Sequence, residues 1–477
     1  MKKIRLLAIY MVIIVLISSL QICSFAVDEP RTNAAAVVLA DMDSGVIIYE
    51  KNMNQMRAPA SLTKIMTGLL AAEAVERGDI DLDEIIPAPS NCWDGMDLDS
   101  SNAEIRPGEK LTFRDYLYCA MVKSANEACN AIAVAVDGSI QGFVNRMNLR
   151  ANELGAKHTF FSDTNGLSDK DHYTTAYDLY LITLEAMKHE LFVDAVNTID
   201  YEIEETDMHA KRYLNSSNAL LCQDGTYGDG YLYLPASGVK TGYTNAAGYC
   251  LVSTAEKDDM RLLAVVLGCG GVLNTGEDGY GNFSSTIHLY DWGFKNLERK
   301  TVTRRGEIIN RAPVQFAKDH ATVELRASGD VAFLVPKDID EGRITTEITI
   351  DQNNLKAPIA VGTVLGKETV RIDGKEYASI KLYTAEAVEA DRVSLATAWL
   401  IKQFADPKVK IIAFSLLILI VIILLIVIRY RLEKKRHINE IAEAEEKRRR
   451  EREIQENMEK SRQAQKQLEE FRKNSDR

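Results

Sequence analysis

The sequence is poor in cysteine: seven of its 477 residues are Cys, and none forms a C-x-x-C pair or a cluster with histidine. This spacing argues against a zinc site, and we expect neither a metal ion nor another cofactor. A chain of this length can bury a sizeable core and has little need of disulfides. The six cysteines that follow Cys23 should therefore be mostly buried thiols.

Glycine and proline are also sparse, at 28 and 10 residues, which excludes collagen-like and disordered chains. Positive charge is scarce too, because 57 Lys and Arg stand against 69 Asp and Glu, a net charge of -12. Residues 429–477 hold 16 Lys and Arg and 12 Asp and Glu, which leaves the rest of the chain at -16. A chain this acidic argues against nucleic acid as a partner.

Long hydrophobic runs are confined to the two ends of the chain. Residues 1–26 begin with basic side chains, continue through an apolar stretch over residues 6–20, and end on small residues at and before Ala26. This layout is typical of a secretory signal peptide that is cleaved after Ala26. The alternative is an uncleaved N-terminal anchor, because the apolar stretch is long.

The second run, residues 411–428, is interrupted only by Ser415 and would span about 27 Å as a helix, enough to cross a bilayer. Five Lys or Arg follow it directly, against three before it, so the positive-inside rule places residues 429–477 in the cytoplasm. Both runs predict a single-pass protein of the cell membrane with residues 27 to about 405 outside. We expect the tail to be a solvated helix, with coiled-coil pairing or contact with anionic lipid as alternatives.

Between these runs, hydrophobic periodicity predicts two domains and a linker. Residues 27–301 have strand patterns at both ends and helix patterns between them, which predicts an α/β (α+β) domain with an antiparallel sheet, shared by its terminal segments, and a helical subdomain. Residues 302–393 contain short Val-, Ile- and Thr-rich segments separated by turns, which predicts a small β-sandwich. Residues 394–410 should form an amphipathic linker helix before the transmembrane helix.

Three short motifs carry the functional argument: Ser61-x-x-Lys64, Ser124-x-Asn126 and Lys240-Thr241-Gly242. Each is weak alone, because Ser-x-x-Lys recurs at 237–240 and Ser-x-Asn recurs at 100–102 and 216–218. Their contexts differ, however: the three motifs fall at a helix start, between two helices and on a strand. All three in this order are typical of β-lactamases and penicillin-binding proteins.

The first motif predicts a nucleophile beside a base. Ser61 and Lys64 are three residues apart on one face of a helix, so the amine can reach the hydroxyl. A lysine whose pKa is lowered by desolvation or by another cation can remove the hydroxyl proton. The alternative is a serine that caps the helix and a lysine on the surface.

The other two motifs offer groups for holding a substrate. Ser124 could pass a proton into a cleft, and Asn126 offers both a donor and an acceptor to a peptide-like substrate. Lys240 and Thr241 could hold a carboxylate, while Gly242 lets a substrate backbone approach closely. As alternatives, Ser124 caps a helix and the third motif forms an exposed turn.

With their flanking residues, these motifs resemble the low-molecular-mass penicillin-binding proteins that act as serine-type D-alanyl-D-alanine carboxypeptidases, the peptidase S11 family. The resemblance covers residues 30–300 and, through the expected accessory β-domain, 300–395. It extends to further matching segments: Asn165-Gly166-Leu167, His172-Tyr173-Thr174-Thr175-Ala176 and Trp292-Gly293-Phe294. It implies that residues 27–301 form a β-lactamase/transpeptidase-like catalytic domain.

The resemblance implies that Ser61 attacks the carbonyl between the two terminal D-alanines of a peptidoglycan stem peptide, forms an acyl-enzyme and releases D-alanine. It implies Lys64 as the base and Ser124 as the proton relay to the leaving amine. The substrate-binding residues would be Asn126 for the amide, Lys240, Thr241 and Gly242 for the carboxylate end, and the N–H groups of Ser61 and Tyr243 as an oxyanion hole. β-Lactam antibiotics are implied as covalent inhibitors, and no metal is required.

The sequence departs from this family in two places. Many relatives have an Arg-Phe pair ahead of Trp292, whereas this chain has Asn282-Phe283, so a carboxylate contact is missing or is supplied by another residue. A spanning helix also replaces the amphipathic anchor that is common in relatives.

Two rival activities are disfavoured, and a third stays open. A β-lactamase usually needs a Glu to activate water, and residues 163–178 contain none. A receptor that signals through its tail would need a catalytic domain there, and none can be recognised in the sequence of residues 429–477. Transpeptidation stays open, because it differs only in whether water or an amine accepts the acyl group.

Overall fold

The computed structural model describes residues 29–97, 99–167, 171–222, 230–270, 280–319, 322–351 and 354–474. The expected signal peptide, residues 1–26, and Cys23 lie outside them. The chain divides into two compact units: Met1–Asn310 with Leu325–Asp351 and Val364–Tyr383, and Arg311–Glu324 with Gln352–Thr363 and Thr384–Arg477.

The first unit is built on a five-stranded antiparallel sheet with the order β2-β1-β9-β8-β7. Its strands are β1 (Ala36–Asp41), β2 (Ile47–Lys51), β7 (Ala236–Thr244), β8 (Gly248–Lys257) and β9 (Met260–Cys269). Strand β1 pairs along its length with β9, which confirms that the two ends of this region share a sheet. Strand β7 has one paired neighbour and so forms an edge of the sheet.

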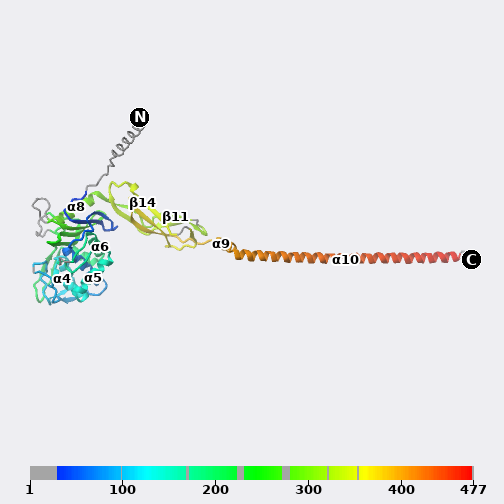
Figure 1. The fold of residues 1–477 in the computed structure, drawn as a ribbon, viewed down its shortest axis with the longest axis horizontal. Helices are drawn as coiled ribbons and strands as arrows, with labels where there is room; N and C mark the ends of the chain where they lie inside the picture. Colours follow the sequence, from blue (N-terminus) through cyan, green and yellow to red (C-terminus); the bar gives the residue numbers. More distant parts are fainter. Residues whose placement is uncertain are drawn as a thin grey trace, which may run out of the picture. The chain divides into compact units, whose positions relative to one another are not determined.

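Alternation along β1 explains why the sheet is covered on both faces. Ala36, Val38 and Ala40 belong to one buried cluster, together with the helices that follow β2. Val37 and Leu39 belong to a second cluster with Leu289, Tyr290 and other residues of α8 (Gly281–Asn296). Because successive side chains of a strand point to opposite faces, the unbroken apolar run of residues 36–40 in β1 is buried on both sides of the sheet. Figure 1 shows α4 and α5 on one side of the sheet and α8 on the other.

The helical subdomain surrounds a central helix, α2 (Lys64–Glu76), in which ten of thirteen residues are buried. The short turn η1 (Ala60–Thr63) leads directly into it. The other helices are α3 (Phe113–Met121), α4 (Asn126–Asp137), α5 (Ile140–Glu153), α6 (Ala176–Ala186) and α7 (Glu190–Asn197). Two hairpins complete this part, β3 (Ile85–Pro87) with β4 (Lys110–Thr112), and β5 (Asp200–Ile203) with β6 (Arg212–Asn215).

Local sequence signals set the ends of these helices. Thr112 and Asp115 form a reciprocal capping box at the start of α3, which satisfies backbone N–H groups that would otherwise lack partners. Helix α4 ends at Gly138, whose φ of 69° lies in the left-handed region that glycine adopts without steric cost. The loop that carries Ser124 connects the C-terminus of α3 to the N-terminus of α4.

The region after α8 is a small β-sandwich. A two-stranded sheet of β10 (Leu297–Thr303) and β13 (Val331–Pro336) stands beside a six-stranded sheet with the order β14-β16-β17-β12-β11-β15. The strands of the larger sheet are β11 (Ile308–Gln315), β12 (Thr322–Ala327), β14 (Ile344–Ile350), β15 (Leu355–Lys356), β16 (Val364–Ile372) and β17 (Lys375–Thr384), with η2 (Glu341–Arg343) ahead of β14. Val331, Phe333 and Val335 of β13 share one buried cluster with Val370 and Ile372 of β16.

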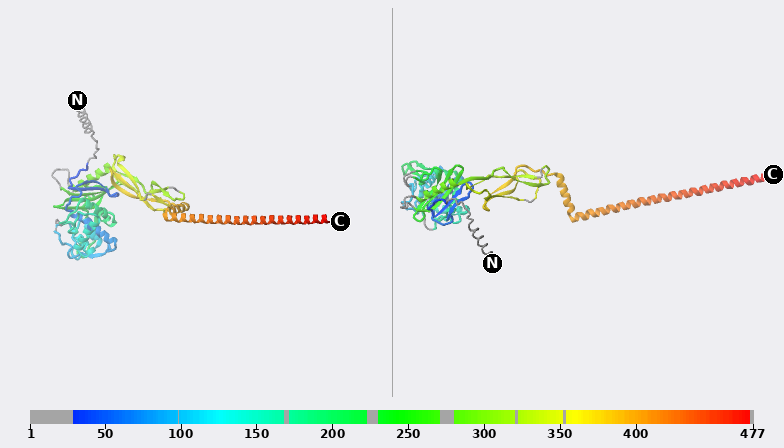
Figure 2. Two further views of the ribbon diagram at one scale, coloured as in Figure 1. Left: turned by 45° about the vertical axis from the view of Figure 1, so that its right-hand side comes forward. Right: turned by 90° about the horizontal axis from the view of Figure 1, so that it is seen from above.

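Two helices end the described chain. Helix α9 (Arg392–Ala405) begins at Asp391, whose carboxylate accepts from the N–H groups of Val393 and Ser394. Helix α10 (Pro407–Asn474) contains the one described segment that is long and apolar enough to cross a membrane, with a mean hydropathy of 3.7 and no buried residues. Figure 2 shows α10 as one uninterrupted helix, so the charged tail is helical as expected.

The thiols behave as the composition predicts. Within the described residues Cys92, Cys119, Cys129, Cys250 and Cys269 are buried free thiols, and Cys222 is half-buried. Burial raises the pKa of the Cys129 thiol to about 12, so this group is an inert part of the core.

Candidate active site

Ser61 and Lys64 meet at the junction between η1 and α2. The Lys64 Nζ atom donates to Ser61 Oγ at 2.8 Å, as the three-residue spacing predicts. Ser61 is not a helix cap: the residues that flank η1 and α2 are Pro59 and Thr63, and neither makes a side-chain cap bond. The two side chains are therefore in contact, and neither the alternative of a capping serine nor that of a surface lysine fits the structure.

Lys64 is fully buried and surrounded by oxygen acceptors. Besides Ser61, its amine donates to Asn126 Oδ1 at 2.7 Å and to the backbone oxygen of Asn165 at 2.9 Å. Burial lowers the pKa of Lys64, and the nearby Cys129, Asp163 and Glu127 oppose this shift only in part. A lysine in this setting gives up its proton more readily than one in water.

Ser124 and Asn126 occupy the junction between α3 and α4. Ser124 has a φ of 61° and is 5% exposed. It does not cap α4, because the cap position is Ala125. The junction is held by the N–H groups of Ala125 and Asn126, which donate to Cys119 and Ser101 carbonyls at 2.9 and 3.0 Å. No hydrogen bond of the Ser124 hydroxyl is present among the described residues, so it is available to a bound substrate.

Lys240, Thr241 and Gly242 lie inside strand β7, at the edge of the sheet that faces η1. At Gly242 an added Cβ would come within 3.2 Å of the N atoms of Ser61 and Leu62. The strand and the nucleophile turn thus approach each other closely, and a side chain at this position would require the turn to shift by a few tenths of an ångström. The motif is buried strand and not an exposed turn.

Lys240 is the second buried lysine of this site. Its burial, together with the positive charge of Lys64, lowers its pKa to about 7, and Cys129 opposes the shift. Its amine donates to the Thr241 carbonyl at 3.2 Å. Within the part of the chain that the structure describes, neither lysine amine bonds a carboxylate. Burying two lysines in this way is costly in a protein interior.

Tyr243 follows at the rim and is 52% exposed. Its hydroxyl donates to Asn245 at 3.0 Å, and its ring packs on Tyr249 with 4.4 Å between centroids. The Tyr243 ring therefore leans along the sheet surface, and its backbone follows Gly242 directly beside the Ser61 turn.

A loop that bears no catalytic motif closes the site from the other side. At Gly166, with a φ of 90°, an added Cβ would come within 1.9 Å of the Ala60 oxygen, so only glycine fits against the nucleophile turn. The preceding Asn165 supplies the third acceptor for Lys64. The sequence marked Asn165 and Gly166 as part of a matching segment but did not indicate this contact.

His172 supports the nucleophile turn through Thr63. The Ser162 N–H donates to His172 Nδ1 at 3.2 Å, so Nδ1 carries no proton and the neutral ring is protonated at Nε2. Nε2 then donates to Thr63 Oγ1 at 2.8 Å, and Thr63 donates to the Ala60 carbonyl at 2.8 Å. Burial lowers the pKa of His172, which favours this neutral form.

Two further side chains lie near β7. Ser217 Oγ is 2.7 Å from Thr241 Oγ1, although the sequence suggested that the 216–218 Ser-x-Asn recurrence was accidental. Asn282, of the Asn282-Phe283 pair, is buried and donates to the Cys250 carbonyl at 3.3 Å. Asn282 thus bonds the sheet backbone.

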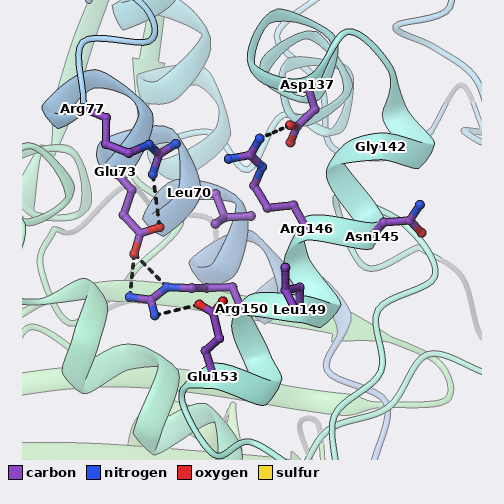
Figure 3. A pocket seen from close by; sticks show the side chains of 10 residues that line it. All are labelled: Leu70, Glu73, Arg77, Asp137, Gly142, Asn145, Arg146, Leu149, Arg150 and Glu153. Atoms are coloured by element: carbon purple, nitrogen blue, oxygen red, sulfur yellow. Dashed lines mark hydrogen bonds and ion pairs between the residues drawn. The ribbon is translucent and has the colours of Figure 1, made fainter.

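A surface cavity of about 580 Å³ lies elsewhere, between the C-terminal half of α2 and α5. Figure 3 shows its charged side chains turned toward one another. Arg150 bonds Glu73 and Glu153, Arg77 approaches Glu73, and Arg146 pairs with Asp137. Because these charges are already paired, the cavity offers neither a nucleophile nor a free cation to a substrate.

Comparison with protein families gives two matches along the chain. A family model described as D-alanyl-D-alanine carboxypeptidase matches residues 23–271. A second, described as the C-terminal domain of penicillin-binding protein 5, matches residues 297–390. The first match includes all three motifs.

Individual proteins agree with these matches. The D-alanyl-D-alanine carboxypeptidase DacF of Bacillus subtilis is 32% identical over 348 residues, which cover 73% of this chain and 84% of that protein. DacA of Escherichia coli K12 is 29% identical over 353 residues, 72% of this chain and 81% of that protein. The crystal structure of penicillin-binding protein 5 from Haemophilus influenzae is 29% identical, with a TM-score of 0.63, and covers 76% of this chain and 99% of its own.

Proposed function

Because the chain belongs to the peptidase S11 family of D-alanyl-D-alanine carboxypeptidases, we propose that it removes the terminal D-alanine from peptidoglycan stem peptides. The observation that carries this function is the 2.8 Å contact between Ser61 Oγ and the buried amine of Lys64. Penicillins and other β-lactams would acylate the same serine.

The partners of Lys64 explain how it acts as a base. Two of its three acceptors, Asn126 Oδ1 and the Asn165 carbonyl, cannot donate a hydrogen. A neutral amine keeps one N–H on each of them, and its lone pair is left for the Ser61 hydroxyl. Ser61 Oγ then attacks the substrate carbonyl while its proton moves to Lys64 Nζ.

The remaining steps use the groups around this pair. The N–H groups of Ser61 and Tyr243 stabilise the oxyanion of the tetrahedral intermediate, which is typically worth several kcal/mol. Ser124 relays the proton from Lys64 to the leaving amine of D-alanine, so the C–N bond breaks and an ester to Ser61 remains. Water then attacks the ester, releases the shortened peptide and restores the Ser61 hydroxyl.

Binding of the substrate uses both sides of the cleft. Asn126 bonds the substrate amide, and Lys240 and Thr241 hold the terminal carboxylate. The close approach of Gly242 to η1 supports a peptide backbone that lies alongside edge strand β7. A carboxylate beside Lys240 favours its charged form and so raises its pKa above about 7.

For the whole chain we propose a cleaved signal over 1–26, a catalytic domain over 27–301 and an accessory domain over 302–393. The linker helix, 394–410, leads to a membrane span over 411–428. The exposed apolar surface of that span supports an anchor in the cell membrane. The excess of basic residues after the span supports an extracytoplasmic site and a cytoplasmic tail over 429–477.

The test uses the full chain in detergent with a peptide that ends in D-Ala-D-Ala. We expect release of D-alanine and covalent labelling by fluorescent penicillin, both lost in Ser61→Ala. Ser100→Ala, which changes the serine of a Ser-x-Asn recurrence outside the site, is the matched control and should retain both. Release of D-alanine by Ser61→Ala would refute the mechanism. Rapid penicillin turnover without peptide cleavage would instead indicate a β-lactamase.

A further inference from the structure

The part of the site that would bind the substrate carboxylate has fewer hydrogen-bond donors than a carboxylate can accept from. A carboxylate has two oxygens, each able to accept two hydrogen bonds. The residues assigned to it so far are Lys240 and Thr241. Asn282, at the position where many relatives have Arg, bonds the Cys250 carbonyl and is therefore engaged with the sheet. A further donor must come from another element.

Ser217 stands where that donor is needed. Its Oγ lies 2.7 Å from Thr241 Oγ1, so the two hydroxyls form a pair next to Lys240. Ser217 is half-buried, and Thr241 is 9% exposed, so solvent reaches this pair. One hydroxyl of the pair donates to the other. An anion that accepts from both would allow each hydroxyl to rotate and donate outward.

The fold holds Ser217 in this position from both sides. Its N–H donates to the Val122 carbonyl at 3.3 Å, next to the loop that carries Ser124. The following Asn218 is buried, and its side-chain amide donates to the Gly238 carbonyl of β7 at 2.7 Å. Residues 216–218 are therefore tied both to the α3–α4 junction and to the strand that carries Lys240.

The hairpin that leads into this segment is itself anchored in the interior. Arg212 of β6 forms a buried ion pair with Glu109 and donates to the Ala103 carbonyl at 2.8 Å. Ser216, four residues later, donates its N–H to the Ile199 carbonyl at 2.7 Å. The Ser217 hydroxyl is thus preorganised, and a substrate would not need to order a loose segment to use it.

We propose that Ser217 is a substrate-binding residue whose hydroxyl donates to the terminal carboxylate of the substrate, together with Thr241 and Lys240. This inference rests on the proposed function, because it takes the terminal carboxylate of a D-Ala-D-Ala peptide as the ligand. Ser217 supplies the contact for which this chain has no Arg before Phe283. It makes the site selective for a free carboxylate over a neutral end.

The experiment compares Ser217→Ala with wild type on two ligands that differ only in charge: a penicillin and its methyl ester. Acylation of the full chain by each is measured by competition with fluorescent penicillin. A hydrogen bond to a charged group predicts a fall of about 10-fold or more in acylation by the free acid and a much smaller change for the ester. KM for the D-Ala-D-Ala peptide should rise, with kcat nearly unchanged.

Two further variants separate binding from structure. Ser217→Thr keeps the hydroxyl and should retain the preference for the free acid. Ser216→Ala removes the neighbouring hydroxyl, which accepts from the Asn218 N–H and does not contact Thr241, and should leave the preference unchanged. Equal losses on acid and ester in Ser217→Ala, or no loss on either, would overturn the role of Ser217. A wild-type chain that fails to release D-alanine would refute the proposed function instead.

Discussion

The catalytic region and helix α10 depart in opposite ways from the rule that charged side chains are exposed and apolar side chains are buried. Around Ser61, two lysines are buried, and no carboxylate of the described residues bonds either amine. Along Ile411–Ile428, almost every side chain is apolar and exposed. In water each arrangement is unfavourable, because burial penalises charge and exposure penalises apolar surface.

Each departure is explained by something other than the chain itself, which is a substrate in one region and lipid in the other. The buried lysines suit a site that operates on a neutral amine and binds an anionic ligand. The exposed apolar helix suits a lipid environment. Lipid offers no water to the backbone, and the N–H and C=O groups of a helix bond one another within the helix. A departure from ordinary burial therefore points to function in both regions, but to a substrate in one and to a membrane in the other.

The largest expected effect comes from removing the buried base. Lys64→Met should slow acylation by penicillin by about 10²- to 10⁴-fold, the usual contribution of a positioned general base. The rate is measured with fluorescent penicillin under single-turnover conditions. Lys157→Met, which removes an exposed lysine, is the control and should acylate at the wild-type rate. A Lys64→Met chain that reacts normally would mean that the burial of this lysine has no catalytic meaning.

The next effect contrasts ion pairs in the two regions. Arg212→Gln leaves Glu109 charged and buried without its partner, which should lower the free energy of unfolding by about 3–5 kcal/mol. Arg450→Gln removes an exposed pair of α10 and should leave stability unchanged within error. Denaturant unfolding of the full chain in detergent measures both. Equal effects would show that burial of the pair is not what matters.

Membrane insertion depends on the exposed face of α10. Leu419→Arg places a charge near the middle of the apolar segment and should weaken insertion by about 2.5–3.5 kcal/mol. Membranes are washed with alkaline carbonate, and the fraction of chain that stays in the pellet is measured. Leu419→Ala keeps the helix neutral and should stay bound. Full retention of Leu419→Arg would indicate that another segment anchors the protein.

The smallest effect concerns pH. Because burial lowers the pKa of His172, the unfolded chain binds more protons than the folded chain at pH values between the folded pKa and about 6.5. The contribution of His172 to stability is therefore present above pH 6.5 and is lost as pH falls through that window, at no more than about 1.4 kcal/mol per pH unit. Thermal unfolding against pH should show a shallower slope in His172→Gln than in wild type. If His172→Gln and wild type show the same slope, His172 is not the cause of the pH dependence.

Several local features could be predicted because they depend on near neighbours in the chain. The strand patterns at the two ends of residues 27–301 indicated a shared sheet, and the three-residue spacing of Ser61 and Lys64 indicated their contact. The Ser-x-Asn recurrence at 216–218 looked accidental, since nothing local shows that it lies against β7.

The sequence by itself determined the long apolar segment near the C-terminus, the three motifs and the order in which they occur, because hydropathy and spacing are properties of short stretches. Only the tertiary structure decided that Asn165 completes the surroundings of Lys64, that His172 supports the Ser61 turn through Thr63, and that Ser217 faces Thr241. Each of these contacts joins residues from 24 to 109 positions apart. Their distances follow from packing the helical subdomain against the sheet, and no local pattern encodes that packing.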